Sequence, residues 1–326
     1  MRCSTETPLR NQHRPKVFST FHLLSSILYS LRVRWQKITI VGVGLLGGSL
    51  GMAIKRRKLA CRVEGYVRRA ASIIECRALR AVDRATQDLR SAVVGADLVI
   101  LCTPLSQMLP LVKQMLPVLK RGAVVTDVGS VKTSVVRELE SELAKAHAHF
   151  VGSHPMAGAE KSGVKAARPN LFVNAACVVT PTRKSDRTAV RTLEQFWKSL
   201  GGRVIQLAPE VHDRLVSRTS HLPHIVAATL ASSVLDPAQP GPQTALCANG
   251  FRDTTRIASG SPEMWRDIAL ANRRHLANSL RTYIADLKKI QRLIGKADAK
   301  AIARFLETAK ARRDRWCACG ASPSPE

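Results

Sequence analysis

The chain has 326 residues, of which 45% are hydrophobic and 4% aromatic, and its 51 Lys and Arg against 24 Asp and Glu give a formal net charge of +27. This length allows two domains, and no apolar run reaches the roughly 18 residues of a membrane-spanning helix. Because the basic residues are spread along the chain and few aromatic residues are available to stack on bases, we interpret the charge as a solvated surface and expect neither a nucleic-acid nor a membrane partner.

The eight cysteines form no C-x-x-C pair, and several lie in apolar runs, such as Cys102 in LVILCTP. This pattern is typical of reduced, buried thiols in a cytoplasmic protein rather than of a disulfide framework. A zinc site built from His212, His221 and His224 is disfavoured, because we find no carboxylate or thiolate near them to complete it, and we predict no metal.

Residues 1–36 fit no fold pattern and contain a modest apolar stretch, FHLLSSILYSL, without a clean small-residue cleavage site. Such a segment is a transit peptide, a poor signal peptide or sequence upstream of a misplaced start codon. We favour the last of these or a disordered extension, and we expect residues 314–326 to form a disordered tail.

From residue 37 to about residue 208, strand-like and helix-like patterns alternate. Strands that alternate with helices of this length predict a doubly wound, mostly parallel α/β sheet of the Rossmann type, and near-continuous apolar strands indicate that helices cover both faces. We therefore assign residues 37–208 to a dinucleotide-binding domain. The strand candidates are residues 37–43, 61–67, 97–104, 123–130, 149–155, 174–181 and 203–207, and the helix candidates are residues 45–57, 106–120, 131–146 and 186–200.

Residues 38–50 read ITIVGVGLLGGSL and carry the most informative motif, three glycines at Gly42, Gly44 and Gly47 between a strand and a helix. The first glycine makes the tight turn, the second lets the backbone approach a pyrophosphate, and the third lets the helix pack closely on the strand. The N–H groups at the start of the helix, beside Leu45 and Leu46, are available to phosphate oxygens. The motif predicts a dinucleotide site.

The end of the second predicted strand sets the preference between the two nicotinamide dinucleotides. An NAD site places an acidic residue here to bind the ribose 2′-hydroxyl, whereas this chain has Val67 followed by Arg68 and Arg69. Since arginine can bind a 2′-phosphate, we predict that NADP is preferred over NAD. Thr103 and Pro104, at the end of the third predicted strand, complete the predicted cofactor contacts.

The strand pattern ends near residue 208, and residues 209–236, 262–293 and 296–313 read as three long amphipathic helices. We assign residues 209–313 to an all-α domain for dimerisation and substrate binding, since long helices with apolar stripes beside a cofactor domain indicate a subunit interface. We expect a homodimer with its active site in the cleft between the two domains.

Four further motifs follow in order: DVGSVK at 127–132, GSHPMAGAE at 152–160, HDRLVSRTSHLPH at 212–224 and GFRDTTRIASGSPEMWRDI at 250–268. With the glycine motif they resemble the prephenate/arogenate dehydrogenase family of tyrosine biosynthesis, over about residues 37 to 300. The resemblance implies oxidative decarboxylation of prephenate or arogenate. In that reaction a hydride passes from C4 of the substrate to a nicotinamide cofactor, and the ring carboxylate leaves as carbon dioxide.

The resemblance also implies roles for individual residues. His154 matches the catalytic histidine, which accepts a hydrogen bond from the C4 hydroxyl, and the ordinary histidine pKa near physiological pH suits that role. Ser130 matches a catalytic serine that bridges this histidine, the hydroxyl and the cofactor. Arg256 matches an arginine whose planar fork binds a substrate carboxylate. The other matches in the substrate cleft are Ser220, His212, His224, Trp265 and Glu160.

Two details depart from the pattern of the family. Val67 with Arg68 and Arg69 moves the expected cofactor preference away from NAD, and Ala159 stands where many relatives carry threonine. Pro223, between two histidines of the third motif, is expected to kink its helix. Two other functions remain as alternatives, namely another NADP-dependent two-domain dehydrogenase or reductase and a basic nucleic-acid-binding protein. The first alternative would want a lysine on the helix after the cofactor domain, and residues 212–224 contain none. The choice between prephenate and arogenate stays open.

Overall fold

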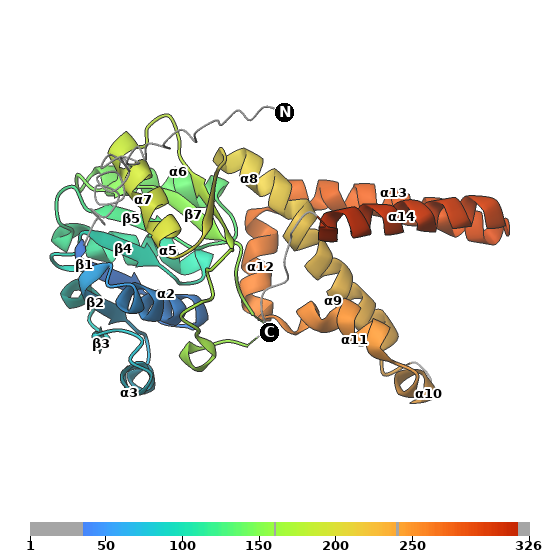
Figure 1. Ribbon diagram of the computed structural model, residues 1–326, viewed down its shortest axis with the longest axis horizontal. Helices are drawn as coiled ribbons and strands as arrows, with labels where there is room; N and C mark the ends of the chain where they lie inside the picture. The colour runs from blue at the N-terminus through green and yellow to red at the C-terminus, as the bar shows by residue number, and fades with distance from the viewer. Residues whose placement is uncertain (1–34, 160, 239–240, 319–326) are drawn as a thin grey trace, which may run out of the picture. The chain divides into compact units, whose positions relative to one another are not determined.

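Residues 35–208 contain a six-stranded parallel sheet (Figure 1). We call these residues the nucleotide-binding region, after the domain that the sequence predicts there. The computed structural model describes residues 35–159, 161–238 and 241–318. The strands are β1 Trp35–Val41, β2 Ala60–Tyr66, β3 Arg84–Thr86, β4 Leu98–Leu101, β5 Val124–Asp127 and β6 His149–Phe150, in the order β3-β2-β1-β4-β5-β6. Every neighbouring pair is parallel. The order reverses between β1 and β4, and doubly wound sheets bind ligands at the carboxyl ends of the strands at such a point.

Helices cover both faces of this sheet. They are α2 Leu45–Arg56, α3 Ala70–Ala78, α4 Leu89–Val93, α5 Leu105–Met115 and α6 Thr133–Ala144. In β4, Leu98 and Ile100 belong to one buried cluster while Val99 and Leu101 belong to another, so each face of the sheet has its own apolar core. The predicted doubly wound α/β fold is confirmed. The prediction lacks α3, α4 and β3, because short elements show too little periodicity to be recognised.

Three of the predicted strands form a second, smaller sheet instead of extending the first. β7 Gly152–Pro155, β8 Ala176–Thr180 and β9 Arg203–Gln206 lie in that order, with β7 antiparallel to β8 and β8 parallel to β9. The single strand predicted at 149–155 is divided at Val151, whose amide still bonds to β5 while the following residues pair with β8. The connection from β8 to β9 is α7 Arg187–Ser199.

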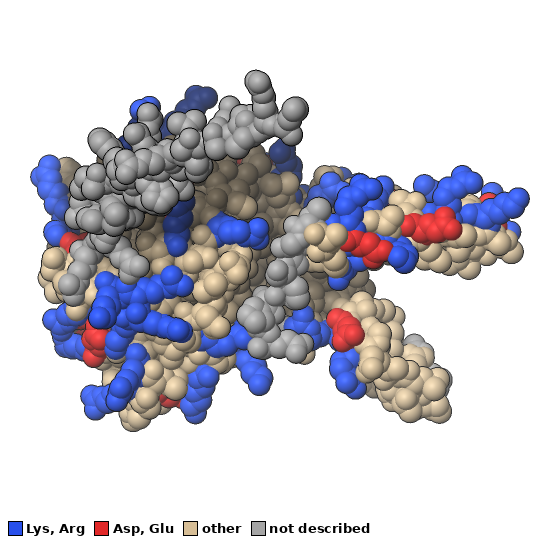
Figure 2. All heavy atoms as spheres, viewed as in Figure 1, with Lys and Arg blue, Asp and Glu red and all other residues tan. Residues whose placement is uncertain are grey.

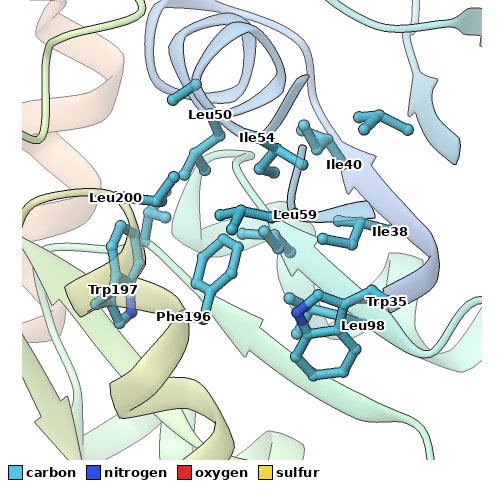
Figure 3. Close-up of a cluster of buried hydrophobic side chains, with 14 of the residues drawn as sticks. Trp35, Ile38, Ile40, Leu50, Ile54, Leu59, Leu98, Phe196, Trp197 and Leu200 are labelled. Atoms are coloured by element: carbon cyan, nitrogen blue, oxygen red, sulfur yellow. The ribbon is translucent and has the colours of Figure 1, made fainter. Parts of the chain in front are cut away.

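Figure 3 shows the larger of the two apolar cores. Its side chains come from strands β1 and β4 and from helices α2 and α7, which pack on the same face of the sheet. Because α7 follows β8, this core joins the end of the nucleotide-binding region to its beginning. The labelled side chains include Ile38 and Ile40 from β1, Leu98 from β4, Leu50 and Ile54 from α2, and Phe196 and Trp197 from α7.

The helical region is the part of the chain from residue 209 to residue 318. It begins with α8 Pro209–Val216, a π-helical turn η3 Ser217–His221, and α9 Leu222–Val234. The all-α character predicted for this region is confirmed, with α10 and α11 in addition to the predicted helices. α13 and α14 pack on each other (Figure 1). The remaining elements are α10 Gly241–Ala245, α11 Asn249–Thr255, the short 3₁₀ turn η4 Arg256–Ser259, α12 Pro262–Ala271, α13 Arg273–Gly295 and α14 Ala299–Ala318.

Two of the predicted long helices are interrupted. The helix predicted at 209–236 contains the π turn just before Pro223, which has no N–H to donate and sits in the first turn of α9. The helix predicted at 262–293 is interrupted at Asn272, whose φ of −108° and ψ of 24° separate α12 from α13. Both interruptions lie beside His221, which is the last residue of η3 and contacts the Asn272 side chain.

The ends and the surface of the described chain bear on three further predictions. β1 starts at Trp35 and α14 continues to Ala318, so ordered elements enter both segments that were predicted to be disordered. Residues 1–34 and 319–326 lie outside the described residues. Within the described ranges, no helix is both long and apolar enough to cross a membrane. Lys and Arg side chains are spread over the visible face rather than gathered in one band (Figure 2).

Candidate active site

The glycine turn between β1 and α2 has the geometry that its three glycines require. Gly42 has a φ of +97°, and a Cβ there would lie 2.8 Å from the Cys102 carbonyl oxygen. A Cβ on Gly47 would lie 2.1 Å from the Gly42 carbonyl oxygen, so no larger residue fits while α2 packs on β1. A Cβ on Gly44 would meet no atom within 4 Å, so this part of the backbone is open to an approaching phosphate.

The open side of this turn forms a cleft of about 350 Å³. Leu45, Leu46 and Gly47 are not among its lining residues; they form the first turn of α2 behind it. Gln107 and Glu263 line the cleft too, and no sequence pattern marks them, because α5 and α12 reach it only in the folded chain. The predicted cofactor residues that do line it are Gly42, Gly44, Arg68, Arg69, Thr103 and Pro104.

Two features of this cleft fit a dinucleotide. The Thr103 hydroxyl is buried and has no hydrogen-bond partner among the described residues, and such a group is costly to bury unless a ligand supplies the partner. Arg68 and Arg69 are exposed, and the Val67 side chain before them is buried in the core. The position at which an NAD site holds an acidic residue is therefore apolar, and two cations follow it.

His154 lies on β7 and is buried, with 6% of its surface exposed. Its Nδ1 lies 2.9 Å from Nε2 of His212 on α8, and Nδ1 of His212 lies 2.8 Å from Oδ1 of Asp213. The two rings and the carboxylate form a continuous chain that ends at Nε2 of His154. Asp213 is the carboxylate that the sequence analysis did not find beside His212.

The first amides of α6 hold the Asp213 carboxylate in place. Its Oδ1 accepts the backbone N–H of Lys132, and its Oδ2 accepts that of Thr133, each at 2.8 Å. The start of a helix favours an anion at this position. Burial by itself raises the pKa of Asp213, but the hydrogen bonds that it accepts, led by the one from His212, outweigh burial and lower this pKa. The site therefore holds a carboxylate.

Lys132 joins this chain to the sheet. Its fully buried ammonium forms an ion pair with Asp127, which is also fully buried at the end of β5, and donates to the Ser153 carbonyl oxygen at 2.8 Å. The Ser153 amide donates to Asp127 at 3.2 Å. Since Ser153 precedes His154, these bonds place the histidine beside the carboxyl end of β5. Lys132 lies in the same DVGSVK motif as Ser130, and no local pattern predicts that its side chain is buried against Asp127.

The surroundings of His154 keep its imidazole neutral. Burial is the first cause, and Coulombic repulsion from His212, when that ring is protonated, and from Lys132 lowers the pKa of His154 further, well below its ordinary value of 6.5. The ordinary pKa near physiological pH that the sequence suggests for His154 is wrong, because it does not hold for a ring removed from water. The buried ring is therefore a proton acceptor at physiological pH.

A second pair of histidines lies in the helical region. His224 on α9 stacks on Trp265 of α12, with ring centroids 3.5 Å apart and planes 9° apart, and His221 meets the same indole edge-on. Nδ1 of His221 lies 3.1 Å from the side-chain nitrogen of Asn272. Burial lowers the pKa of both histidines, that of His221 to about 4. The stacked pair brings together two of the predicted substrate residues as neutral, flat surfaces.

Other predicted residues lie on separate elements. Ser130 follows β5, and its backbone lies against the His221 ring. Ser220 is half-buried in η3, and Arg256 is exposed at the start of η4, which packs on α9. Glu160 lies outside the described residues. Ser130 is thus the predicted residue that links the end of the sheet to the second pair of histidines.

The position of His212 differs from the role that the resemblance implies. Its side chain is fully buried, and both ring nitrogens are bonded, one to His154 and one to Asp213. No ring nitrogen is left for a substrate, so the geometry fits a residue that orients His154. Among residues 35–159, 161–238 and 241–318, no group of three or more His, Cys, Asp or Glu side chains is arranged to hold a metal ion.

Two family models match the chain. Residues 50–206 match the model described as prephenate dehydrogenase, nucleotide-binding domain. Residues 208–308 match the model described as prephenate dehydrogenase, dimerization domain. Because the first match begins after the glycine turn, the case for a dinucleotide at Gly42, Gly44 and Gly47 depends on the geometry of that turn.

Similar proteins of known identity cover most of the chain. Prephenate dehydrogenase of Bacillus subtilis is 37% identical over 85% of this chain and 75% of the relative. Cyclohexadienyl dehydrogenase of Zymomonas mobilis is 36% identical over 85% of this chain and 95% of the relative. A crystal structure of prephenate dehydrogenase from Aquifex aeolicus, in complex with hydroxyphenyl propionate and NAD+, is 33% identical with a TM-score of 0.80 and covers 86% of this chain and 98% of that one. Synechocystis arogenate dehydrogenase is 33% identical with a TM-score of 0.71 and covers 86% of this chain and 99% of that one.

Proposed function

Because the chain belongs to the prephenate dehydrogenase family, we propose that it catalyses the oxidative decarboxylation of prephenate, arogenate or both in tyrosine biosynthesis, with a nicotinamide dinucleotide as cofactor. The observation that carries the proposal is the buried, neutral His154, bonded through His212 to Asp213 and placed beside the end of β5. This is the sheet edge that also carries the glycine turn. An unprotonated base near a dinucleotide cleft is what removal of a hydroxyl proton during hydride loss requires.

In the proposed reaction His154 first accepts a proton from the substrate and later returns it to the product. As the hydride leaves C4 of the substrate, Nε2 of His154 accepts the proton of the C4 hydroxyl. The ring carboxylate then leaves as carbon dioxide, its bonding electron pair makes the ring aromatic, and His154 returns the proton to the phenolic oxygen. The bound nicotinamide supplies the acceptor for the hydride. Since no proton is released overall, the low pKa of His154 favours this return.

Residues at the end of β5 and in the helical region bind the substrate in this proposal. Arg256 forms two hydrogen bonds to a substrate carboxylate through its planar guanidinium. Ser130 bridges His154, the substrate hydroxyl and the cofactor, and the stacked His224 and Trp265 form one wall of the site. The other residues assigned to the substrate cleft are Ser220 and Glu160.

NADP is the cofactor that we propose to be preferred over NAD. Arg68 and Arg69 line the cleft just after β2, where Val67 offers no carboxylate to a ribose hydroxyl. One charge-assisted bond to the 2′-phosphate contributes about 1.5–3 kcal/mol, or roughly ten- to a hundredfold in specificity.

The helical region, which matches the dimerization domain, is proposed to form a homodimer. Ile284, Leu287 and Ile294 are exposed at helical spacing on α13, and Leu306 and Trp316 are exposed on α14. A symmetric second copy would cover these side chains. The cysteines in the described residues are all free, which supports the cytoplasmic location that we also propose.

Initial rates with both substrates and both dinucleotides test the proposed function. Purified protein is mixed with prephenate or arogenate and with NAD+ or NADP+, and the reduced cofactor is followed by its absorbance. We expect turnover with at least one pair, and a His154→Asn variant whose kcat is lower by roughly 10²–10⁴. The cofactor Kd of this variant should not change, because the glycine turn and the arginines hold the dinucleotide.

A matched control for this variant is His147→Asn. His147 is exposed and has a φ of +53°, which asparagine tolerates well, so kcat should stay at the wild-type value. Absence of turnover with all four pairs would contradict the proposed function. A His154→Asn variant with wild-type kcat would contradict the role of the histidine.

A further inference from the structure

The buried series of hydrogen bonds from His154 through His212 to Asp213 has a fixed order of donors and acceptors. We propose that Asp213, acting through His212, is a positioning residue that selects the tautomer of His154. In this tautomer Nδ1 carries the hydrogen and Nε2 presents its lone pair to the substrate hydroxyl. The inference rests on the proposed function, in which His154 is the base.

This order is set at Asp213. Its Oδ1 lies 2.8 Å from the Lys132 amide nitrogen, and its Oδ2 lies 2.8 Å from the Thr133 amide nitrogen. A backbone N–H can only donate, so both carboxylate oxygens act as acceptors. Nδ1 of His212 lies 2.8 Å from Oδ1 and donates as the third partner. Asp213 thus accepts three hydrogen bonds, as an ionised carboxylate does.

The tautomers of both rings follow from this order. With its hydrogen on Nδ1, neutral His212 has a lone pair on Nε2, which lies 2.9 Å from Nδ1 of His154. That nitrogen of His154 must then donate, so its Nε2 is unprotonated. If His212 carried its hydrogen on Nε2 instead, Nδ1 and Oδ1 of Asp213 would face each other at 2.8 Å as two acceptors. One arrangement of hydrogens therefore satisfies every contact while both rings are neutral.

Lys132 holds Asp213 and His154, the two ends of this hydrogen-bonded series, at a fixed separation. Its backbone amide binds Asp213, and its ammonium binds Asp127 and the Ser153 carbonyl, one residue before His154. The carboxylate that sets the tautomer and the strand that carries the base are thus fixed by one buried residue. Such support holds a catalytic group in its productive orientation before the substrate arrives.

Two substitutions separate selection of the tautomer from mere packing. In Asp213→Asn an NH2 group replaces one of two oxygens that each accept a backbone N–H. Only the orientation that gives up the Lys132 bond donates to Nδ1 of His212, and this orientation reverses the hydrogens on both rings and leaves one on Nε2 of His154. We expect kcat to fall in proportion to the share of molecules in the reversed form, up to about 10³–10⁴-fold for complete reversal, as when an amide replaces the carboxylate of a catalytic triad, with KM and the cofactor Kd nearly unchanged. In His212→Gln the amide oxygen still accepts from Nδ1 of His154, so kcat should fall by less than about tenfold.

The double variant gives the sharpest comparison. Phenylalanine cannot relay a reversal, whereas a glutamine amide could flip and relay it, so adding Asp213→Asn to His212→Phe should lower kcat by less than about threefold. A purely structural role of Asp213 predicts the same cost in both backgrounds, and equal costs would overturn the inference. Thermal unfolding of each variant, followed by circular dichroism, separates loss of the fold from loss of kcat.

A measurement without substrate tests the inference independently of turnover. Nitrogen-15 NMR of the ligand-free protein distinguishes a hydrogen on Nδ1 from one on Nε2, and the spectrum of His154→Asn assigns the ring. We expect the hydrogen on Nδ1 of His154 in the wild type, and in Asp213→Asn a share on Nε2 of His154 that matches the loss of kcat. A hydrogen on Nε2 in the wild type would overturn the inference even if Asp213→Asn did not fold. Absence of turnover with a wild-type ring of the expected tautomer would count against the proposed function alone.

Discussion

The nucleotide-binding region and the helical region differ in how much apolar surface they bury within one chain. The six-stranded sheet has a buried core on each face. In the helical region α14 buries no residue and α13 buries only Leu276 and Ser279, and most of the exposed large apolar side chains in the described ranges lie there. The first region is complete within the chain, whereas the second presents a surface that a second copy would cover.

The hydrogen-bonded network around His154 lies where these two regions meet. His154 and Lys132 come from the nucleotide-binding region, and His212 and Asp213 come from α8. All four are buried and bonded to one another, while the arginines that we assign to the ligands are exposed. The difference is that the hydrogen-bonded residues around His154 are buried within the chain, whereas Arg68, Arg69 and Arg256 lie on its surface.

The largest effect is expected from breaking the buried ion pair of Lys132, whose backbone amide binds Asp213 of the helical region. Lys132→Met leaves Asp127 as a buried carboxylate without its cation, and such a loss costs about 3–5 kcal/mol of unfolding free energy. Urea unfolding measures it. The control is Lys120→Met, whose ion pair with Asp97 leaves the lysine 53% exposed and is worth about 0–1 kcal/mol. Equal losses in the two variants would show that the fold does not depend on this ion pair.

The next effect tests whether the helical region needs a second copy. Ile284→Asp combined with Leu287→Asp places two carboxylates on the exposed face of α13. We expect light scattering to give the wild type twice the chain mass of 35.6 kDa. The dimer Kd of the variant should rise at least about 100-fold, since burying unpaired charges costs several kcal/mol. Ile74→Asp, on α3 and 72% exposed, is the control. A wild-type mass of one chain at every dilution would rule out the dimer.

A smaller effect concerns the accessible arginines of the cofactor cleft. Arg68→Ala combined with Arg69→Ala should lower kcat/KM for NADP about 10–100-fold and change that for NAD by less than about threefold. The control is Arg77→Ala, because Arg77 lies on α3, the helix that follows Arg69, but outside this cleft. The cofactor proposal fails if the wild type uses NAD as well as NADP, or if the double variant loses both equally.

The fold could be predicted from the sequence because its signals are local. Each predicted strand is an apolar run that can be recognised from a few neighbouring residues. Gly42, Gly44 and Gly47 lie between a strand and a helix, where each has a separate steric reason to be glycine. The break of the predicted helix at Asn272 could not be predicted, because that residue is set by contacts with Asp213 and His221 more than 50 positions away in the chain.

The candidate site shows the same limit. His154 could be predicted because it lies in a recognisable motif, but Asp213 was missed even though it follows His212 directly. Its partners, Lys132 and Thr133, lie 81 and 80 positions away in the chain, and nothing in the local sequence says that the start of α6 would be there. The pKa of His154 was also misjudged, because burial and a cation brought from another element decide it.

The buried position of the base affects stability at acid pH. An unfolded histidine binds a proton with a pKa of 6.5, whereas in the folded protein the pKa of His221 is about 4 and that of His154 is also lowered. Between pH 6.5 and 4 the unfolded state therefore binds more protons, and the free energy of unfolding falls as the pH falls. Activity at acid pH must be compared at a temperature where the protein stays folded.

The smallest effect is then expected in the pH profile of kcat near neutrality. A base with the ordinary pKa of 6.5 would lose about half of its activity at that pH. Because burial, and after it repulsion from protonated His212 and from Lys132, holds the pKa of His154 well below this value, kcat should change by less than about twofold between pH 6.5 and 8 and fall only at more acid pH. Saturating initial rates across this range measure it. An ionisation near pH 6.5 that disappears in His154→Asn would mean that water reaches the ring, and the buried chain to Asp213 would then not describe the working enzyme.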